Sequence, residues 1–421
     1  MTPQIKQRIE QIRRGEVPDG YKKTKVGVVP NEWEETRFKK MFSRLSRKNK
    51  ENNDNVLTIS AQYGLISQRD FFNKDIASED KSNYFLLHKG EFAYNKSYSN
   101  GYPFGALKRL DMYDKGIVSP LYICFSANES NKCPDFYVHY FEAGMMNREI
   151  QAFAQEGARN HGLLNISVDD FFNSYLLMPP LDEQKKIAEI LSAQDKLIAF
   201  KEKLIEEKKR QKKALMQQLL TGKKRLPGFS DEWKPTKLKK LLKERKTYSQ
   251  KGLEYPHVTL STDGIYAKTE RYDREHLVKS EDKEYKITHK GDICYNPANL
   301  KFGVICVNTF GDAIFSPIYV TFEVQQDVDL GFLSNYLMRW DFINAVRKYE
   351  EGTVYERMAV KPEDFLKFEI KLPSIEEQKA ISKILSLYDS EIELLKNDLY
   401  QEKQKKKALM QLLLTGIVRA K

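Results

Sequence analysis

Residues 212–222 read Lys-Lys-Ala-Leu-Met-Gln-Gln-Leu-Leu-Thr-Gly, and residues 406–416 read Lys-Lys-Ala-Leu-Met-Gln-Leu-Leu-Leu-Thr-Gly. Extended backwards, this similarity covers residues 179–222 and 373–416 without a gap, and 21 of the 44 positions are identical. A repeat of this length is the signature of a duplicated structural unit. We therefore interpret the chain as two tandem copies of one module.

Shorter echoes precede each copy of the repeat. The Glu-Trp pair of Glu32-Trp33 returns at Glu232-Trp233, and the turn-like Ser119-Pro120-Leu121-Tyr122 returns as Ser316-Pro317-Ile318-Tyr319. His88-Lys89-Gly90 likewise corresponds to His289-Lys290-Gly291. Each module is thus predicted to be a globular domain followed by the repeated tail.

The repeated tails are predicted to be long helices. Apolar residues recur in them at steps of three and four, for example Ile187, Ile190 and Leu191 in the first copy, which is the pattern of an amphipathic helix. Gly222 and Gly416 are suitable terminators, and Ser374 with Glu377 forms a potential capping box. A helix of about 38 residues is about 57 Å long, and its narrow apolar stripe requires a partner helix.

We expect the two helices to pair with each other as an antiparallel coiled coil, which relates the two modules by an approximate two-fold axis. Alternating segments such as 56–60 and 255–260 predict strands, and helical patterns lie near 135–153 and 329–348. The fold class is therefore α+β. The predicted division is an N-terminal segment with a short helix, a first domain, a central helix, a second domain and a C-terminal helix, at residues 1–30, 31–180, 181–222, 223–374 and 375–421.

Composition limits the class of protein. The chain has 421 residues and a formal charge of +11, and 41% of its residues are hydrophobic. Such a chain can build real cores, and its surplus of cations favours an anionic partner such as nucleic acid. No apolar run approaches the length of a membrane span, and the first thirty residues lack a signal-peptide core. We expect a soluble, cytoplasmic protein that does not bind membranes.

Catalytic motifs are absent from the sequence. It has no phosphate-binding Walker loop and no glycine-rich dinucleotide turn. The four cysteines and six histidines are not spaced as metal ligands, so no metal site is predicted. Asn296-Pro297-Ala298-Asn299 approaches the Asn-Pro-Pro-aromatic motif of base methylation but lacks the second proline and the aromatic residue. We predict no catalytic residue and no cofactor in this chain.

Polar loops at matching places in both modules suit DNA instead. Asn and Lys side chains can bond to base edges or phosphates, and Tyr can do either from a rigid stem. The candidate DNA-binding residues of the first module are Tyr94, Asn95, Lys96, Tyr98, Asn100, Tyr102, Lys108, Arg109, Arg159 and His161. Those of the second module are Tyr295, Asn296, Asn299, Lys301, Tyr355 and Arg357.

Taken together, these motifs resemble a known family. The pattern Pro…Glu-Gln-Lys-x-Ile, followed by a Lys-rich helix that ends in Ala-Leu-Met-Gln…Leu-Thr-Gly, occurs in mid-chain and again at the end, each time after a variable domain. The openings Gly20-Tyr21-Lys22-Lys23-Thr24…Trp33 and Leu226-Pro227-Gly228-Phe229…Trp233 also fit. Over essentially its whole length the chain resembles the specificity subunit (HsdS) of a Type I restriction–modification system.

That resemblance implies that each globular domain is a target recognition domain, which reads one half of a split, asymmetric site in double-stranded DNA. It also implies that the paired helices set the spacing and seat two methyltransferase subunits, which bind S-adenosylmethionine and methylate adenine. Restriction subunits, where present, add ATP- and Mg-dependent translocation and cleavage. The family has no fixed motif for base contacts, so the candidate residues come from loop chemistry alone.

Our leading hypothesis is a non-catalytic DNA-recognition subunit of a methyltransferase and restriction complex. Two alternatives remain open at this point. One is a self-contained DNA methyltransferase or nuclease with a cryptic centre, and the other is a coiled-coil scaffold that does not touch DNA. Catalytic turnover by the purified chain would support the first alternative. Absence of salt-dependent DNA binding in a titration would support the second.

Overall fold

The computed structural model describes residues 2–60, 64–72, 80–98, 101–156, 164–250, 254–268, 284–349 and 359–420. The chain forms two compact units, Met1–Lys201 together with Asp398–Lys421, and Glu202–Asn397. The boundaries fall inside two long helices, α7 (Leu181–Leu219) and α12 (Ile375–Leu413), so each unit contains part of both. We call them unit 1 and unit 2 and describe each by itself.

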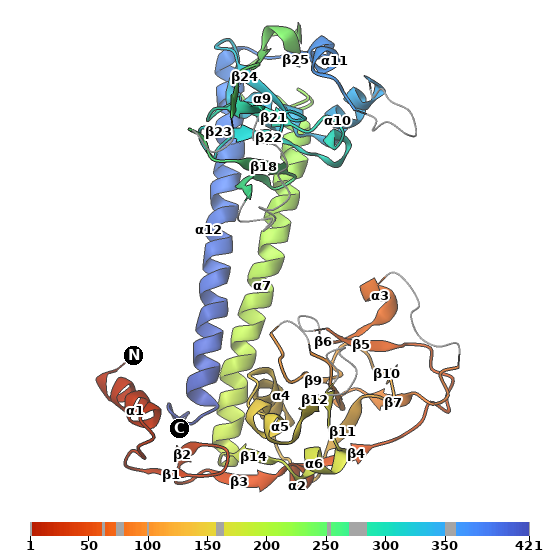
Figure 1. Ribbon diagram of the computed structural model, residues 1–421, viewed down its shortest axis with the longest axis vertical. Helices are drawn as coiled ribbons and strands as arrows, with labels where there is room; N and C mark the ends of the chain where they lie inside the picture. The colour runs from red at the N-terminus through yellow and green to blue at the C-terminus, as the bar shows by residue number, and fades with distance from the viewer. Residues whose placement is uncertain are drawn as a thin grey trace. The chain divides into compact units, whose positions relative to one another are not determined.

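Unit 1 is built around a four-stranded antiparallel sheet with the order β4-β11-β8-β9 (Figure 1). The bounds of these strands are Phe42–Leu45, Ile123–Ala127, Phe92–Asn95 and Ala106–Arg109. Smaller antiparallel pairs surround the sheet: β1 (Tyr21–Lys23) with β2 (Val28–Pro30), β3 (Glu34–Arg37) with β14 (Tyr175–Met178), β5 (Leu57–Ser60) with β6 (Gly64–Ser67), β7 (Phe85–His88) with β10 (Lys115–Val118), and β12 (Gln155–Glu156) with β13 (Leu164–Asn165).

Short helices complete unit 1. They are α1 (Pro3–Arg13), α2 (Phe38–Met41), α3 (Gln68–Phe72), α4 (Pro134–Glu142), α5 (Asn147–Phe153) and α6 (Val168–Asn173). Pro134 occupies the first turn of α4, where its fixed φ favours the helix and its missing N–H is not needed. α4 lies beside the first part of α7, where His139 Nε2 and Ser192 Oγ are 3.0 Å apart (Figure 1).

Among the described residues, unit 2 repeats the main sheet and three of the five smaller strand pairs of unit 1. Its four-stranded sheet has the order β16-β24-β21-β22, with bounds Leu242–Glu244, Val320–Val324, Ile293–Tyr295 and Ile305–Val307. The smaller pairs are β15 (Lys234–Lys237) with β25 (Glu369–Leu372), β18 (Val258–Ser261) with β19 (Gly264–Ala267), and β20 (Glu284–Thr288) with β23 (Ala313–Phe315), to which β17 (Tyr248–Gln250) is added. The shared strand order supports the duplication predicted from the sequence.

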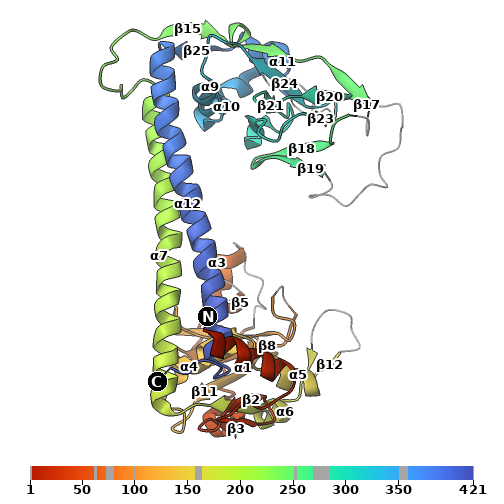
Figure 2. The same cartoon turned by 90° about the vertical axis from the view of Figure 1, so that its left-hand side faces the viewer.

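The helices of unit 2 also match those of unit 1. They are α9 (Leu330–Leu337), α10 (Trp340–Val346) and α11 (Pro362–Lys367), with the 3-10 turns η1 (Leu238–Lys240), η3 (Leu300–Phe302) and η4 (Arg347–Tyr349). Within this unit α9 lies beside the first turns of α12, where the Asp329 N–H donates to Gln378 at 2.9 Å, and the hairpin β18–β19 lies on the far side of the sheets (Figure 2).

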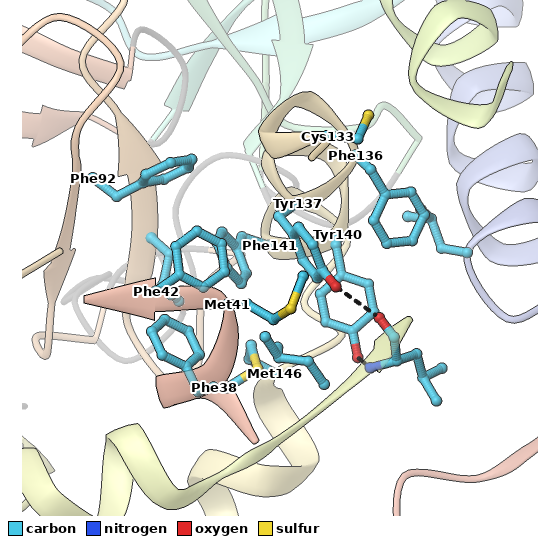
Figure 3. Packing of buried hydrophobic residues seen from close by; sticks show 14 of the residues in the cluster. Phe38, Met41, Phe42, Phe92, Cys133, Phe136, Tyr137, Tyr140, Phe141 and Met146 are labelled. Carbon is cyan, nitrogen blue, oxygen red and sulfur yellow. Dashed lines mark hydrogen bonds between the residues drawn. The ribbon is translucent and has the colours of Figure 1, made fainter. Parts of the chain in front are cut away.

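The core of unit 1 is aromatic and fixes α4 to the strand that leads into α7. Phe38, Phe42 and Phe92 are completely buried and pack together with Phe141 of α4 (Figure 3). Tyr137 donates its hydroxyl to the Leu177 carbonyl at 3.2 Å, and the Leu177 N–H donates to the Tyr140 hydroxyl at 3.3 Å. The domain is therefore rigidly joined to its helix through both apolar packing and hydrogen bonds.

The two long helices pair antiparallel within each unit. In unit 1 Gln194 of α7 donates to the Glu402 carboxylate of α12 at 2.7 Å, and Lys201 pairs with Asp398 at 2.7 Å. In unit 2 Lys208 pairs with Glu391 at 2.6 Å and Lys212 with Asp389 at 2.5 Å. In both units the residue number falls on α12 as it rises on α7, which is an antiparallel register.

A three-residue cluster closes the helix pair in each unit. In unit 1 the buried Glu183, at the start of α7, accepts hydrogen bonds from Trp33 Nε1 at 2.9 Å and from Arg419, just beyond α12, at 2.8 Å. In unit 2 Glu377, at the start of α12, accepts from Trp233 Nε1 at 3.2 Å and from Arg225, just beyond α7, at 2.7 Å. We call these the helix-end clusters.

The structure confirms the predicted α+β class, the two tandem domains and the antiparallel long helices. The capping box is only half right, because Ser374 accepts the Glu377 N–H but the Glu377 carboxylate bonds to Arg225 and Trp233 instead. The division into five segments stays a prediction, since the compact units cut through both helices. Among the described helices, none combines the length and apolarity needed to span a membrane.

Candidate nucleic-acid interface

Several connecting loops leave the main sheet of each unit at one end. In unit 1 β8 ends at Asn95, which pairs with Ala106 at the start of β9, and Ile123 at the start of β11 pairs with Tyr94. In unit 2 Tyr295, the last residue of β21, pairs with both Ile305 and Val320. The predicted DNA-reading stretches 94–102 and 295–301 therefore begin at equivalent places, which we call the loop end of each sheet.

The second predicted loop of each unit returns to the first. The Leu164 N–H, which follows the stretch 156–162, donates to the Lys96 carbonyl at 3.0 Å. The Val360 N–H, which follows the stretch 351–357, donates to the Pro297 carbonyl at 3.3 Å. The fold thus brings the bases of both polar loops together at the loop end, in the same way in both units.

The prediction that Tyr94 and Tyr295 contact DNA is wrong. Both rings are completely buried, so neither presents any surface to a ligand. The Tyr94 hydroxyl donates to the Phe104 carbonyl at 2.6 Å and so joins the start of its own loop to the end. The Tyr295 hydroxyl donates to the Val360 carbonyl at 2.9 Å and so holds the second loop. These tyrosines hold the loops in place through hydrogen bonds to backbone carbonyls.

We expect Tyr94→Phe to lower DNA affinity by about fivefold, because removal of a buried hydrogen bond costs about 1 kcal/mol and frees the neck of the loop. The effect is confined to the first half-site, and Tyr295→Phe acts in the same way on the second. Binding to the mapped target, and to targets with one half scrambled, measures this. Tyr137→Phe, which also removes a hydroxyl from the core of unit 1, is the control, and an equal loss of affinity there contradicts the assignment.

Two asparagines shape the loops. The Asn95 side-chain oxygen accepts the Ser97 N–H at 3.1 Å. The nearly buried Asn296 accepts the N–H groups of Ala298 at 3.1 Å and Asn299 at 3.3 Å. Asx turns of this kind fix the local backbone. Asn296 is therefore corrected from an exposed base contact to a residue that shapes the loop.

Three candidates of unit 1 already have partners in the protein. Tyr102 donates to Glu142 at 2.7 Å, and Lys108 forms an ion pair with the same carboxylate. Arg109 pairs with Asp111 at 2.7 Å and with Asp135 at 2.6 Å. These interactions anchor the loop to α4, and Lys108 or Arg109 can reach a phosphate only by exchanging an acidic partner.

Four predicted residues at the loop ends are accessible. Tyr98 is 62% exposed, and Asn299 is exposed on the loop of unit 2. Lys96 is half-buried, and burial lowers the pKa of its ammonium group. Lys301 is partly exposed, with its ammonium 5.5 Å from the ring of Phe302. These four side chains retain the chemistry expected of DNA contacts.

The remaining candidates, Asn100, Arg159, His161, Tyr355 and Arg357, lie outside the described residues. Within the described part of the chain, no group of three or more His, Cys, Asp or Glu side chains is placed to hold a metal ion. Sequence reasoning missed the Arg225 and Arg419 partners of the helix-end clusters, although these arginines occupy equivalent positions of the repeat. It also gave no role to the turns at Leu121 and Ile318.

Comparison with known proteins identifies the family. The family of Type I restriction modification DNA specificity domains matches residues 30–210 and again residues 230–402. The chain belongs to this family. It is 25% identical to the MjaX type I restriction enzyme specificity subunit of Methanocaldococcus jannaschii, over 96% of this chain and 97% of that protein.

Solved structures of the family show the same fold. A chain of a type I restriction–modification system, from a study of complex assembly and conformational transition, matches with a TM-score of 0.56 and 16% identity, over 93% of this chain and 99% of that chain. The S subunit of the type I system from M. genitalium matches with a TM-score of 0.51 and 13% identity, over 90% of this chain and 96% of that chain.

Proposed function

We propose that this chain is the non-catalytic specificity subunit of a type I restriction–modification complex, and that each unit reads one half of a bipartite, asymmetric DNA target. The observation that carries the proposal is that the residue after the second polar stretch bonds to the first polar loop in both units, through Leu164 and Val360, beside equivalent main sheets. The main sheets have the same strand order while the polar stretches differ in sequence. Two different readers on equivalent supports suit two different half-sites.

Electrostatics support DNA as the partner. The net charge of +11 attracts a polyanion at long range, and lysines such as Lys96 and Lys301 stand at the loop ends. Phosphate contacts position a protein on the duplex, whereas base contacts made by side chains such as Tyr98 and Asn299 supply specificity. The same loops therefore contain both kinds of chemistry.

Two equivalent hollows support binding of two methyltransferase subunits. In unit 1 a hollow of about 420 Å³ is lined by Lys407, Met410 and Gln411 of α12 together with Ala143. In unit 2 a hollow of about 430 Å³ is lined by the equivalent residues of α7, at 213, 216 and 217, together with Met338 at the end of α9. Three equivalent helix positions line both hollows, and a feature that occurs twice suits two copies of one partner.

The proposed complex takes its chemistry from its partners. The methyltransferase subunits bring S-adenosylmethionine and methylate adenine, and restriction subunits, where present, bring ATP- and Mg-dependent cleavage. This chain's own residues orient those subunits on the target. We place the complex in the cytoplasm, where its DNA substrate lies.

The test is co-expression with a methyltransferase subunit of the same type of system, followed by single-molecule sequencing of methylated adenine. We expect one specificity chain with two methyltransferase chains and methylation at one bipartite sequence. Lys96→Ala should weaken or relax recognition of the first half only, and Lys301→Ala that of the second. Methylation or cleavage by the purified chain alone contradicts a non-catalytic role, and absence of salt-dependent DNA binding by the complex contradicts DNA recognition.

A further inference from the structure

An exposed apolar side chain occupies the same turn in both units. Leu121 is 61% exposed and Ile318, at the equivalent position of the second module, is 60% exposed. Each follows a proline in a four-residue turn, Ser119–Tyr122 or Ser316–Tyr319, that is closed by a backbone hydrogen bond of 3.1 Å. The two turns are built alike, so the exposed residue is a shared feature of the module.

These turns lie at the loop end of the sheets. Each leads directly into β11 or β24, and the first residue of that strand pairs with Tyr94 or Tyr295, where the reading loop begins. The turn, the first reading loop and the return of the second loop therefore surround the same edge. Each exposed apolar tip therefore lies next to the place where the first predicted reading loop begins.

The turns are rigid. Pro120 and Pro317 fix φ at the first corner. The tyrosine at the end of each turn is anchored to the neighbouring hairpin: the Tyr122 hydroxyl bonds to Thr58, and the Tyr319 hydroxyl lies 3.4 Å from the Thr259 hydroxyl. A tip held in this way loses little conformational entropy when it binds.

We propose that Leu121 and Ile318 insert into the DNA groove and contact the apolar surface of bases, one in each half-site. Leucine and isoleucine can contact the 5-methyl group of thymine in the major groove or press against the face of a base step. The reading loops differ between the units while this contact is shared, which suits a base feature present in both half-sites. The inference rests on the proposed function.

The experiment compares Leu121→Ala and Ile318→Ala in the complex with two methyltransferase subunits, on the mapped DNA target. We expect each variant to lose about tenfold in affinity. The slope of log affinity against log salt should not change, because an apolar contact releases no counterion, whereas Lys96→Ala should reduce that slope by about one unit. Both side chains are exposed, so their truncation leaves the cores intact.

Matched controls come from the opposite end of the same sheets. Met112, between β9 and β10, is 60% exposed, and Phe310, between β22 and β23, is 42% exposed. Alanine at either position should leave DNA affinity unchanged. A target with uracil in place of thymine distinguishes the two base surfaces: loss of affinity by the unmodified protein indicates the methyl group, and its retention indicates the base-step face.

Three results would overturn the inference. The first is affinity of Leu121→Ala and Ile318→Ala equal to that of the unmodified complex. The second is an equal loss in Met112→Ala. The third is impaired assembly with the methyltransferase in the absence of DNA, which would make the turns a protein-docking site. A failure of the proposed function is distinguishable, because the unmodified complex would then show no sequence-specific binding at all.

Discussion

Insertion of one heptad into both long helices is expected to lengthen the unread spacer of the DNA target by about three base pairs. The insertions go between Lys201 and Glu202 and between Asn397 and Asp398, where the two compact units divide. Seven residues add about 10 Å to a helix, and one base pair occupies about 3.4 Å of duplex. A seven-residue insertion also keeps the apolar seam on the same face of each helix. Sequencing of methylated adenine reports the new target.

The same experiment has internal controls. A heptad in α7 alone leaves seven residues without partners on α12, so we expect reduced stability and no new, longer target. A four-residue insertion into both helices adds about 6 Å but turns the following segment by about 40°, which should weaken methylation. If methylation persists when both helices carry the heptad, but the spacer keeps its original length, the helices do not set the spacing.

The long helices were predictable because their signal is local and occurs twice. The stripe that includes Ile187 and Leu191 is buried as expected, and its equivalents Ile381 and Leu385 are buried as well. Ile190 belongs to the same predicted stripe but is 40% exposed, because a two-helix seam covers a narrower face than the sequence pattern suggests. The pairing partner followed from the repeat itself.

The burial of Tyr94 and Tyr295 could not be read from the sequence. Tyr94 is the last but one residue of β8 and Tyr295 is the last residue of β21, and both strands are covered on both faces, so β21 is buried at every position and β8 at all but its last. Without alternation of buried and exposed residues, a polar-tipped aromatic beside an Asn-rich loop looks like part of that loop. The hydrogen bonds from the Tyr94 and Tyr295 hydroxyls to the Phe104 and Val360 carbonyls show that these tyrosines hold the loops in place.

The pairing of charged side chains was also hidden. Lys108 and Glu142 are 34 positions apart, and only the packing of α4 on β9 brings them together. By contrast, the sequence itself contained a signal for the arginine partners of Glu183 and Glu377. Arg225 and Arg419 occupy the same place in the two repeats, three residues beyond Gly222 and Gly416. A repeated cation after a repeated helix predicts a repeated acidic partner.

Glu183→Gln is expected to lower the free energy of unfolding of unit 1 by about 2 kcal/mol, because it removes the charge-assisted hydrogen bonds from Arg419 and leaves Glu32 as the remaining acidic partner of that guanidinium. Glu377→Gln should do the same in unit 2 through Arg225. Urea unfolding of the full chain measures both. Asp195→Asn, which removes an exposed helix–helix ion pair with Lys406, is the control and should cost under about 1 kcal/mol. An equally small effect at Glu183 would contradict a structural role for the cluster.

The helix-end cluster of unit 1 also predicts a pH dependence of stability. Burial alone would raise the pKa of Glu183, but the hydrogen bonds from Arg419 and Trp33 outweigh it and hold the pKa below its ordinary value. The unfolded chain therefore binds this proton more readily than the folded chain. The resulting stability is complete above the ordinary glutamate pKa of about 4.3 and is lost as the pH falls through the lower folded value.

Glu183→Gln abolishes this contribution, so the difference in unfolding free energy between the unmodified chain and the variant should shrink as the pH falls from about 5 to about 3. Parallel curves over that range would show that the Glu183 carboxyl has the same pKa in the folded and unfolded chains, which contradicts the stabilising role of its hydrogen bonds.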